Sequence, residues 1–107
     1  MYTYRIEGGF PIKGRIRASG NKNAALPCIA AAVLTREQVY LRNVPDIEDA
    51  LVMLDIVKEL GVSVERGEEP GSWVMQAEQI RDTVIPTELS KRIRASILFA
   101  GPLLARA

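Results

Sequence analysis

The feature that most constrains this chain is an almost wholly apolar run from Ala24 to Leu34. It is too short to cross a bilayer, because a membrane-spanning helix needs about 20 apolar residues. The run favours a helix, and a helix that is apolar on nearly every side has to be buried by the rest of the chain. We therefore expect this helix in the core, with Pro27 in its first turn, where a missing N–H group is tolerated.

The segments around this helix alternate between strand and helix patterns. Apolar and polar side chains alternate over residues 2–7 and 12–18, which predicts a half-buried antiparallel hairpin. The remaining expected elements are a strand over 39–44, a helix over 46–60, a hairpin of 62–65 with 72–75, a short apolar segment at 83–85 and a helix over 87–105. This order is that of an α/β (α+β) domain.

Residues at the ends of the two later helices indicate where each begins and stops. Asp46 occupies the N-cap position of the first, with Asp49 in its first turn and Gly61 as its C-terminal stop. Thr87 can cap the second, which Gly101-Pro102 should interrupt. The apolar stripe of this last helix has little left to pack on, so we expect the remainder of an enzyme or a second chain to cover it. The alternative is a frayed helix docked on the domain.

Charge and composition limit the classes of function. The chain has 14 basic and 13 acidic residues, a net charge of +1, whereas a nucleic-acid binder of this size is usually far more basic. Histidine is absent, which removes the commonest general base and metal ligand. The single Cys28 excludes an internal disulfide, and in an apolar helix it is expected to be a buried structural thiol. No secretory signal is visible, so we expect a soluble domain in a reducing compartment.

The first candidate for chemistry is the polar loop from Ser19 to Asn23, which leads into the apolar helix. Gly20 allows the backbone to approach a ligand closely. Lys22 and Asn23 lie where free N–H groups and the helix dipole attract an anion. The spacing is not that of a Walker loop. The alternative is that Asn23 is an ordinary N-cap and Lys22 a solvated charge.

The second candidate is the basic stretch from Lys91 to Ser96. Lys91 and Arg94 lie three residues apart, so on a helix they would share a face with room for one anionic group. The small side chains of Ala95 and Ser96 would permit close approach of a phosphate. The alternative is a solvated basic face. Asp46, Glu48 and Asp49 are interpreted as a capping cluster rather than a metal site, and Trp73 as a core residue.

Several motifs resemble the enolpyruvyl transferase family, and within it the UDP-N-acetylglucosamine 1-carboxyvinyltransferases. They are Ser19-Gly20-Asn21-Lys22-Asn23-Ala24-Ala25-Leu26-Pro27, Leu41-Arg42-Asn43-Val44-Pro45, Leu60-Gly61-Val62, Arg94-Ala95-Ser96-Ile97 and Gly101-Pro102-Leu103-Leu104-Ala105-Arg106. All occur in the order of the family, so the resemblance covers essentially the whole chain. The related shikimate-pathway enzymes have Lys-Ser where this chain has Lys22-Asn23, which favours the amino-sugar enzymes.

The resemblance implies two domains, each of three βαβαββ units in an inside-out α/β barrel. Residues 1–21 would supply strands to the second domain, and residues 22–107 would form the first part of the first domain. The family moves the enolpyruvyl group of phosphoenolpyruvate to the 3-hydroxyl of UDP-N-acetylglucosamine, the first committed step of peptidoglycan synthesis in the bacterial cytoplasm. By position, Lys22 and Asn23 would contact phosphoenolpyruvate, and Arg94 the UDP-sugar. No cofactor, metal, nucleic acid or membrane partner is implied.

The chain departs from this family in its length. It lacks the loop that carries the family's reactive cysteine, and Cys28 lies in the wrong motif to replace it. No complete active site can be built from these residues, so the chain is interpreted as the N-terminal part of an enzyme, and no residue in it is assigned as catalytic. The alternatives are a relative of the shikimate-pathway transferases, or a non-catalytic module that binds anions or associates with itself.

Overall fold

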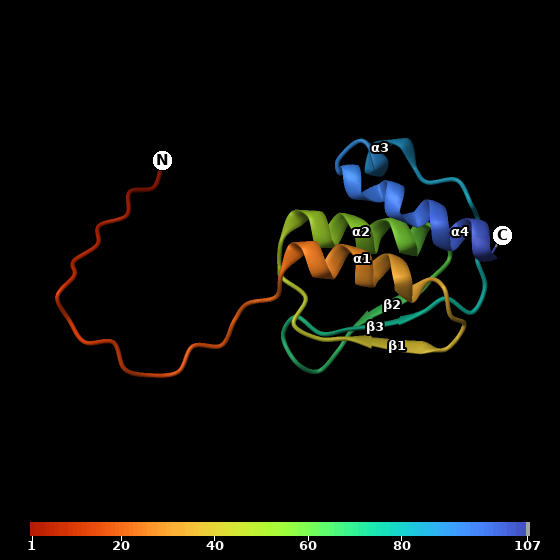
Figure 1. Cartoon of the computed structure of the whole chain (residues 1–107). Helices are drawn as coiled ribbons and strands as arrows, with labels where there is room; N and C mark the ends of the chain where they lie inside the picture. Colours follow the sequence, from red (N-terminus) through yellow and green to blue (C-terminus); the bar gives the residue numbers. More distant parts are fainter. Residues whose placement is uncertain (107) are drawn as a thin grey trace.

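The computed structural model describes residues 1–106 (Figure 1). Helices and a small sheet form one body, and the segment before α1 loops away from it. The elements are α1 (Lys22–Ala32), β1 (Gln38–Leu41), α2 (Glu48–Glu59), β2 (Ser63–Arg66), β3 (Trp73–Gln76), α3 (Thr87–Ser90), the 3-10 helix η1 (Arg94–Phe99) and α4 (Ala100–Arg106). Within residues 1–106, no helix has both the length and the apolar character needed to span a membrane.

The three strands form one sheet in the order β1-β3-β2. β3 is antiparallel to both neighbours, so that Val74 lies opposite Tyr40 of β1 and opposite Glu65 of β2. β1 and β2 therefore run parallel to each other, with α2 connecting them and β3 inserted between them, which is a split β-α-β arrangement. The predicted strand and second hairpin are confirmed to within a few residues.

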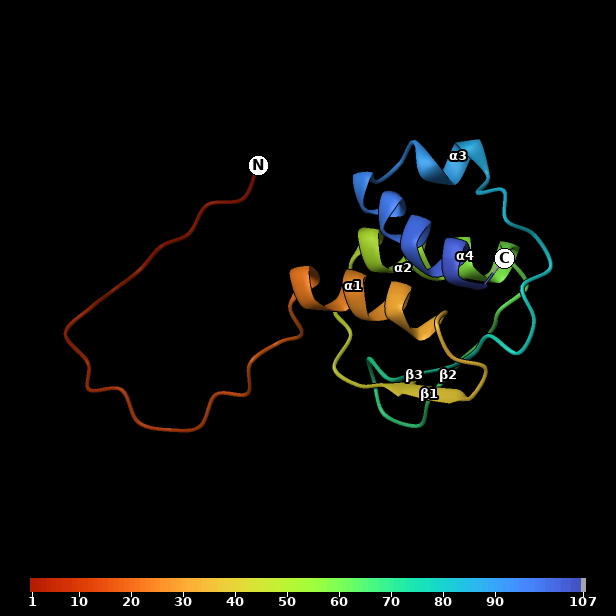
Figure 2. The ribbon, with the colours of Figure 1, turned by 45° about the vertical axis from the view of Figure 1, so that its right-hand side comes forward.

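The body is built in layers, which Figure 2 shows from a second direction. α1 and α2 lie side by side on one face of the sheet, and α3 and α4 lie beyond them. Trp73 and Met75 of β3 are buried on the covered face, as expected for Trp73, and Phe99 from η1 is buried as well. The core therefore lies between the sheet and the helices.

α2 has the amphipathic pattern predicted for it, and its inward side chains are Ala50, Val52, Met53, Leu54, Ile56 and Val57. The predicted stop at Gly61 is confirmed. Gly61 has φ of +96°, and the N–H of Val62 donates to the carbonyl of Val57 at 3.0 Å, as in a Schellman cap. The predicted cap at Asp46 is wrong. The helix begins later, so that the N-cap is Ile47, whose side chain makes no capping hydrogen bond.

α1 differs in two ways from the helix expected there. It begins at Lys22, so Pro27 lies beyond the first turn, inside the helix. One side of α1 is exposed, and Pro27, Cys28 and Ala31 lie on it. The predictions of burial on nearly every side and of a buried Cys28 are therefore wrong for this chain. The physical reason is that the other elements cover only the side of α1 that faces α2 and the sheet.

Residues 1–21 do not form the predicted hairpin. The side chains of Tyr4 and Ile16 are 90% and 96% exposed, although their alternation suits a strand with one buried face. A two-stranded hairpin is only marginally stable on its own and needs an apolar surface beneath it. Figure 1 shows that this segment loops away from the body, so no surface lies beneath it.

The predicted helix over 87–105 is broken into α3, η1 and α4. The break lies before Arg94, because Ile93 is extended, with φ of −141° and ψ of 141°. Its side chain is only 7% exposed, so the extended conformation places it in the core. Two further predictions are wrong: Thr87 does not cap α3, whose N-cap is Pro86, and α4 continues through Gly101-Pro102. Early helix positions tolerate proline because their N–H groups lack helical partners.

Arg106 joins three segments that are far apart in the sequence. Its Nη1 donates to the carbonyls of Val33, at 2.6 Å, and Thr35, at 3.2 Å. Its Nη2 donates to the carbonyls of Ala77, at 2.7 Å, and Glu78, at 3.4 Å. One guanidinium therefore satisfies carbonyls at the end of α1 and after β3, where a positive charge also suits the helix dipole.

Candidate functional site

The start of α1 is held by Asn21 rather than by Asn23. The Asn21 side chain accepts a hydrogen bond from the backbone N–H of Asn23 at 2.7 Å. The alternative considered from the sequence, Asn23 as an ordinary N-cap, is therefore wrong, because the N-cap is Asn21, two residues earlier. The side chain of Asn23 is left available for another role.

Gly20 lies directly against the loop that follows β1. A Cβ atom on Gly20 would be 1.7 Å from the carbonyl oxygen of Asn43 and 2.9 Å from Cδ of Pro45. Asn43 itself has φ of +56°, and its Nδ2 donates to the carbonyl of Ala18 at 3.4 Å. The close approach expected at Gly20 is thus made to a neighbouring loop, and it fixes where α1 begins.

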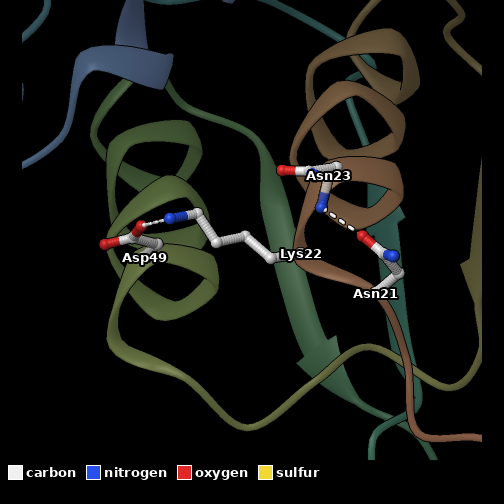
Figure 3. A network of polar contacts seen from close by, with 4 residues as sticks. All are labelled: Asn21, Lys22, Asn23 and Asp49. Carbon is white, nitrogen blue, oxygen red and sulfur yellow. Dashed lines mark hydrogen bonds and ion pairs between the residues drawn. The ribbon is translucent and has the colours of Figure 1, made fainter.

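Lys22 reaches from the first turn of α1 to the first turn of α2, as Figure 3 shows. Its Nζ lies 2.7 Å from Oδ2 of Asp49, and the two side chains are 53% and 32% exposed. An ion pair this exposed adds little stability, at most about 1 kcal/mol. Its structural effect is to hold the ammonium group of Lys22 beside the first turn of α2.

Arg94 lines the same hollow as Lys22. A hollow of about 460 Å³ is lined by Lys22, Asn23, Leu26, Pro27, Asp49, Arg92, Ile93, Arg94, Ala95 and Leu98. The structure therefore brings together all three residues singled out from the sequence, Lys22, Asn23 and Arg94. They come from two motifs that sequence analysis had treated as separate candidates.

A comparison with protein families assigns the chain. The model described as EPSP synthase (3-phosphoshikimate 1-carboxyvinyltransferase) matches residues 6–107. The chain belongs to this EPSP synthase family.

Individual relatives narrow this assignment. Over 106 residues the chain is 58% identical to the UDP-N-acetylglucosamine 1-carboxyvinyltransferase of Treponema pallidum (strain Nichols) and 55% identical to that of Treponema denticola. Each match covers 99% of this chain and 25% of the relative, so the chain spans about a quarter of the length of these relatives. The crystal structure of the enolpyruvyl transferase NikO from Streptomyces tendae has a TM-score of 0.76 and 26% identity, covering 92% of this chain and 23% of that one.

The EPSP synthase family assignment agrees with the fold. From α1 to β3 the order is α-β-α-β-β, which is a βαβαββ unit without its first strand. The predicted fold class, an incomplete α/β unit of an enolpyruvyl transferase, is confirmed by this order and by the similarity to NikO.

The second cationic cluster of this EPSP synthase family chain differs from the prediction. Because Ile93 breaks the helix, Lys91 and Arg94 do not share a helix face. Arg92 lines the hollow instead of Lys91, and its Nη2 lies 2.6 Å from Oε1 of Glu48. Sequence analysis missed Arg92 because its direction depends on this break, and the only available signal was the basic run itself.

Ser96 and Cys28 lie outside the hollow. The Ser96 hydroxyl donates to the carbonyl of Ile93 at 3.1 Å, so it holds the turn rather than facing an anion. Among residues 1–106, no group of three or more acidic, cysteine or histidine side chains could hold a metal ion.

The hollow combines three cations, Lys22, Arg92 and Arg94, with the single carboxylate of Asp49. Its lining therefore has a net charge of +2, and its apolar residues form the rest of the wall. Such a lining can bind and orient a polyvalent anion, because guanidinium and ammonium groups make strong, charge-assisted hydrogen bonds to phosphate and carboxylate oxygens.

Proposed function

We propose that this chain is the opening part of a UDP-N-acetylglucosamine 1-carboxyvinyltransferase, the enzyme of the first committed step of peptidoglycan synthesis. The observation that carries the proposal is the convergence of Lys22, Asn23 and Arg94 on one cationic hollow. The names of relatives that are 58% and 55% identical support it, because they cover 99% of this chain.

The reaction joins the 3-hydroxyl oxygen of UDP-N-acetylglucosamine to the enol carbon of phosphoenolpyruvate. The bond between that carbon and the phosphate oxygen breaks, and phosphate leaves with the proton that the hydroxyl gives up. Both substrates carry several negative charges, which suits the net charge of +2 in the hollow. Lys22 and Asn23 would bind phosphoenolpyruvate, and Arg94 the phosphates of the UDP-sugar, so that their fixed charges stabilise negative charge in the transition state.

The domain assignment belongs to the same proposal. Residues 1–21 would add strands to a second domain, and the body from Lys22 onward would begin the first. The exposed, alternating apolar side chains of the first segment support this division, because they lie away from the body and have no covering surface there. Both substrates and the enzyme would meet in the bacterial cytoplasm.

A shikimate-pathway acceptor is the second candidate, because the matching family model is described by that activity. The difference between the two candidates lies in the acceptor alone. Both use phosphoenolpyruvate, and the experiment therefore has to offer each acceptor separately.

A chimera tests the proposal. This chain replaces the matching 106 residues of the Treponema pallidum relative, and phosphate release is measured with phosphoenolpyruvate and either UDP-N-acetylglucosamine or shikimate 3-phosphate. Turnover with the amino sugar alone is expected. Lys22→Ala should lower kcat/KM by about 100-fold, as removal of a transition-state contact does. Lys58→Ala is the matched control, because Lys58 does not line the hollow. Its Nζ lies 3.8 Å from Oδ1 of Asp55.

A folded chimera that uses only shikimate 3-phosphate would support the second candidate. A folded chimera with no turnover would contradict both and favour a non-catalytic module. Unchanged kinetics of Lys22→Ala would show that Lys22 has no part in the reaction, whichever acceptor is used.

A further inference from the structure

The cation that the sequence did not single out, Arg92, lies in the same hollow as Lys22 and Arg94. Ile93, between the two arginines, has an extended backbone and a side chain that is only 7% exposed. An extended residue directs its own side chain to one side and those of its two neighbours to the other. The Ile93 side chain therefore points into the core at the base of the hollow, and the side chains of Arg92 and Arg94 project from the opposite side of the backbone.

The partner of Arg92 is a carboxylate that can be exchanged. Its Nη2 lies 2.6 Å from Oε1 of Glu48, and the two side chains are 48% and 73% exposed. Exposed ion pairs contribute little to stability, so an incoming anion can displace Glu48 at low cost. Glu48 does not line the hollow, whereas Asp49, the partner of Lys22, does.

Two neighbouring guanidiniums suit a ligand with two linked phosphate groups. Each guanidinium presents a planar fork of N–H donors that matches two oxygens of one phosphate. A single phosphate can occupy one fork fully, whereas a diphosphate offers a separate phosphate group to each fork. Lys22, which comes from α1, remains available for a separate anion.

We propose that Arg92 is a specificity-determining residue of the hollow, which leaves Glu48 on ligand binding and, with Arg94, recognises a diphosphate group. This inference rests on the proposed function where it concerns the acceptor, because UDP-N-acetylglucosamine is the substrate that carries a diphosphate. The selectivity for linked phosphates is a property of this chain alone and can be measured without turnover.

The first experiment titrates the chain itself with pyrophosphate or inorganic phosphate at low ionic strength, where surface charges are least screened. Backbone amide shifts of Asn23 and Ala95 report binding. The wild-type chain should bind pyrophosphate at least about tenfold more tightly than phosphate, the factor that a second charged contact of about 1.4 kcal/mol supplies. Arg92→Gln should remove most of this preference, Arg92→Lys should retain part of it, and Lys58→Gln should leave it unchanged.

Glu48→Gln distinguishes exchange from a merely structural ion pair. If Arg92 has to leave Glu48, Glu48→Gln raises pyrophosphate affinity two- to threefold, and has no such effect when combined with Arg92→Gln. A fall in affinity on Glu48→Gln would overturn the exchange, because it would mean that Glu48 orients Arg92 for binding. A wild-type chain without preference for pyrophosphate would overturn the proposal as a whole.

The second experiment uses the chimera with the Treponema pallidum relative. Arg92→Gln should raise KM for UDP-N-acetylglucosamine about tenfold, with little change in KM for phosphoenolpyruvate. An active chimera in which Arg92→Gln changes neither value refutes the role of Arg92 and leaves the proposed function standing. An inactive chimera contradicts the proposed function, and the pyrophosphate titration then still decides the inference.

Discussion

Arg106 offers the sharpest test of how this body is held together. Replacing it by alanine removes hydrogen bonds of 2.6 Å to Val33 and 2.7 Å to Ala77. Hydrogen bonds to a charged group are worth about 1.5–3 kcal/mol each. Arg106 is only partly buried, so the lower figure applies and the weaker bonds to Thr35 and Glu78 add little. We expect Arg106→Ala to lower the free energy of unfolding by about 3 kcal/mol.

Urea unfolding measures this loss, with the fluorescence of Trp73, the only tryptophan, as the signal. With a urea dependence of about 1.5 kcal/mol/M, the midpoint should fall by roughly 2 M. Arg106→Lys should lose about half as much, because an ammonium group cannot reach both sets of carbonyls. Arg42→Ala is the matched control, since Arg42 is exposed, and it should change the free energy by less than about 0.5 kcal/mol. A loss that small for Arg106→Ala would refute the reasoning, because water would then replace the guanidinium without cost.

Three further predictions use the same unfolding measurement. Gly20→Ala should cost about 1–3 kcal/mol and shift the amide signal of Asn23, because its Cβ would clash with Asn43 at 1.7 Å; an unchanged Asn23 signal would contradict the clash. Gly61→Ala should cost about 1–2 kcal/mol, because Gly61 has φ of +96°; a neutral result would mean that the cap of α2 is not held in this conformation. Deleting residues 1–17 should change the free energy by less than about 0.5 kcal/mol, because they lie outside the body; a larger loss would indicate contacts with it.

The sequence patterns correctly predicted those elements whose formation depends mainly on residues that are close together in the sequence. The stripe of α2 and the stop at Gly61 follow from helix periodicity and from the left-handed conformation that glycine tolerates. The hairpin of β2 and β3 follows from two apolar runs around a turn. These features need no knowledge of what the rest of the chain does.

The failures all involve contacts between distant segments. The alternation in residues 2–18 indicates a strand only if some surface covers one of its faces, and here the segment is exposed and lies away from the body. The helix expected over 87–105 is broken because burying Ile93 prevails over helix periodicity. Cys28 is exposed because the covering of α1 is one-sided.

The candidate site shows the same division. The types of residue at Lys22, Asn23 and Arg94 were enough to mark each as a possible anion contact, and resemblance joined them to one reaction. Their convergence on one hollow depends on the packing of α1 against α2 and η1. The exchange of Lys91 for Arg92 in that hollow depends on a single extended residue, which helix periodicity cannot reveal.

The position of β3 has a consequence for the order in which the body forms. Of the three strands in this sheet, β3 is the last to leave the ribosome, yet it is the one that pairs with each of the other two. Until Gln76 has been synthesised, β1 and β2 have no backbone partner, so the nascent chain can hold helices but no sheet. Sheet formation therefore waits for β3, which pairs locally with β2 and at a longer sequence separation with β1, and distant pairings of the second kind slow folding. A chain interrupted before Trp73 would lose all three strands rather than one.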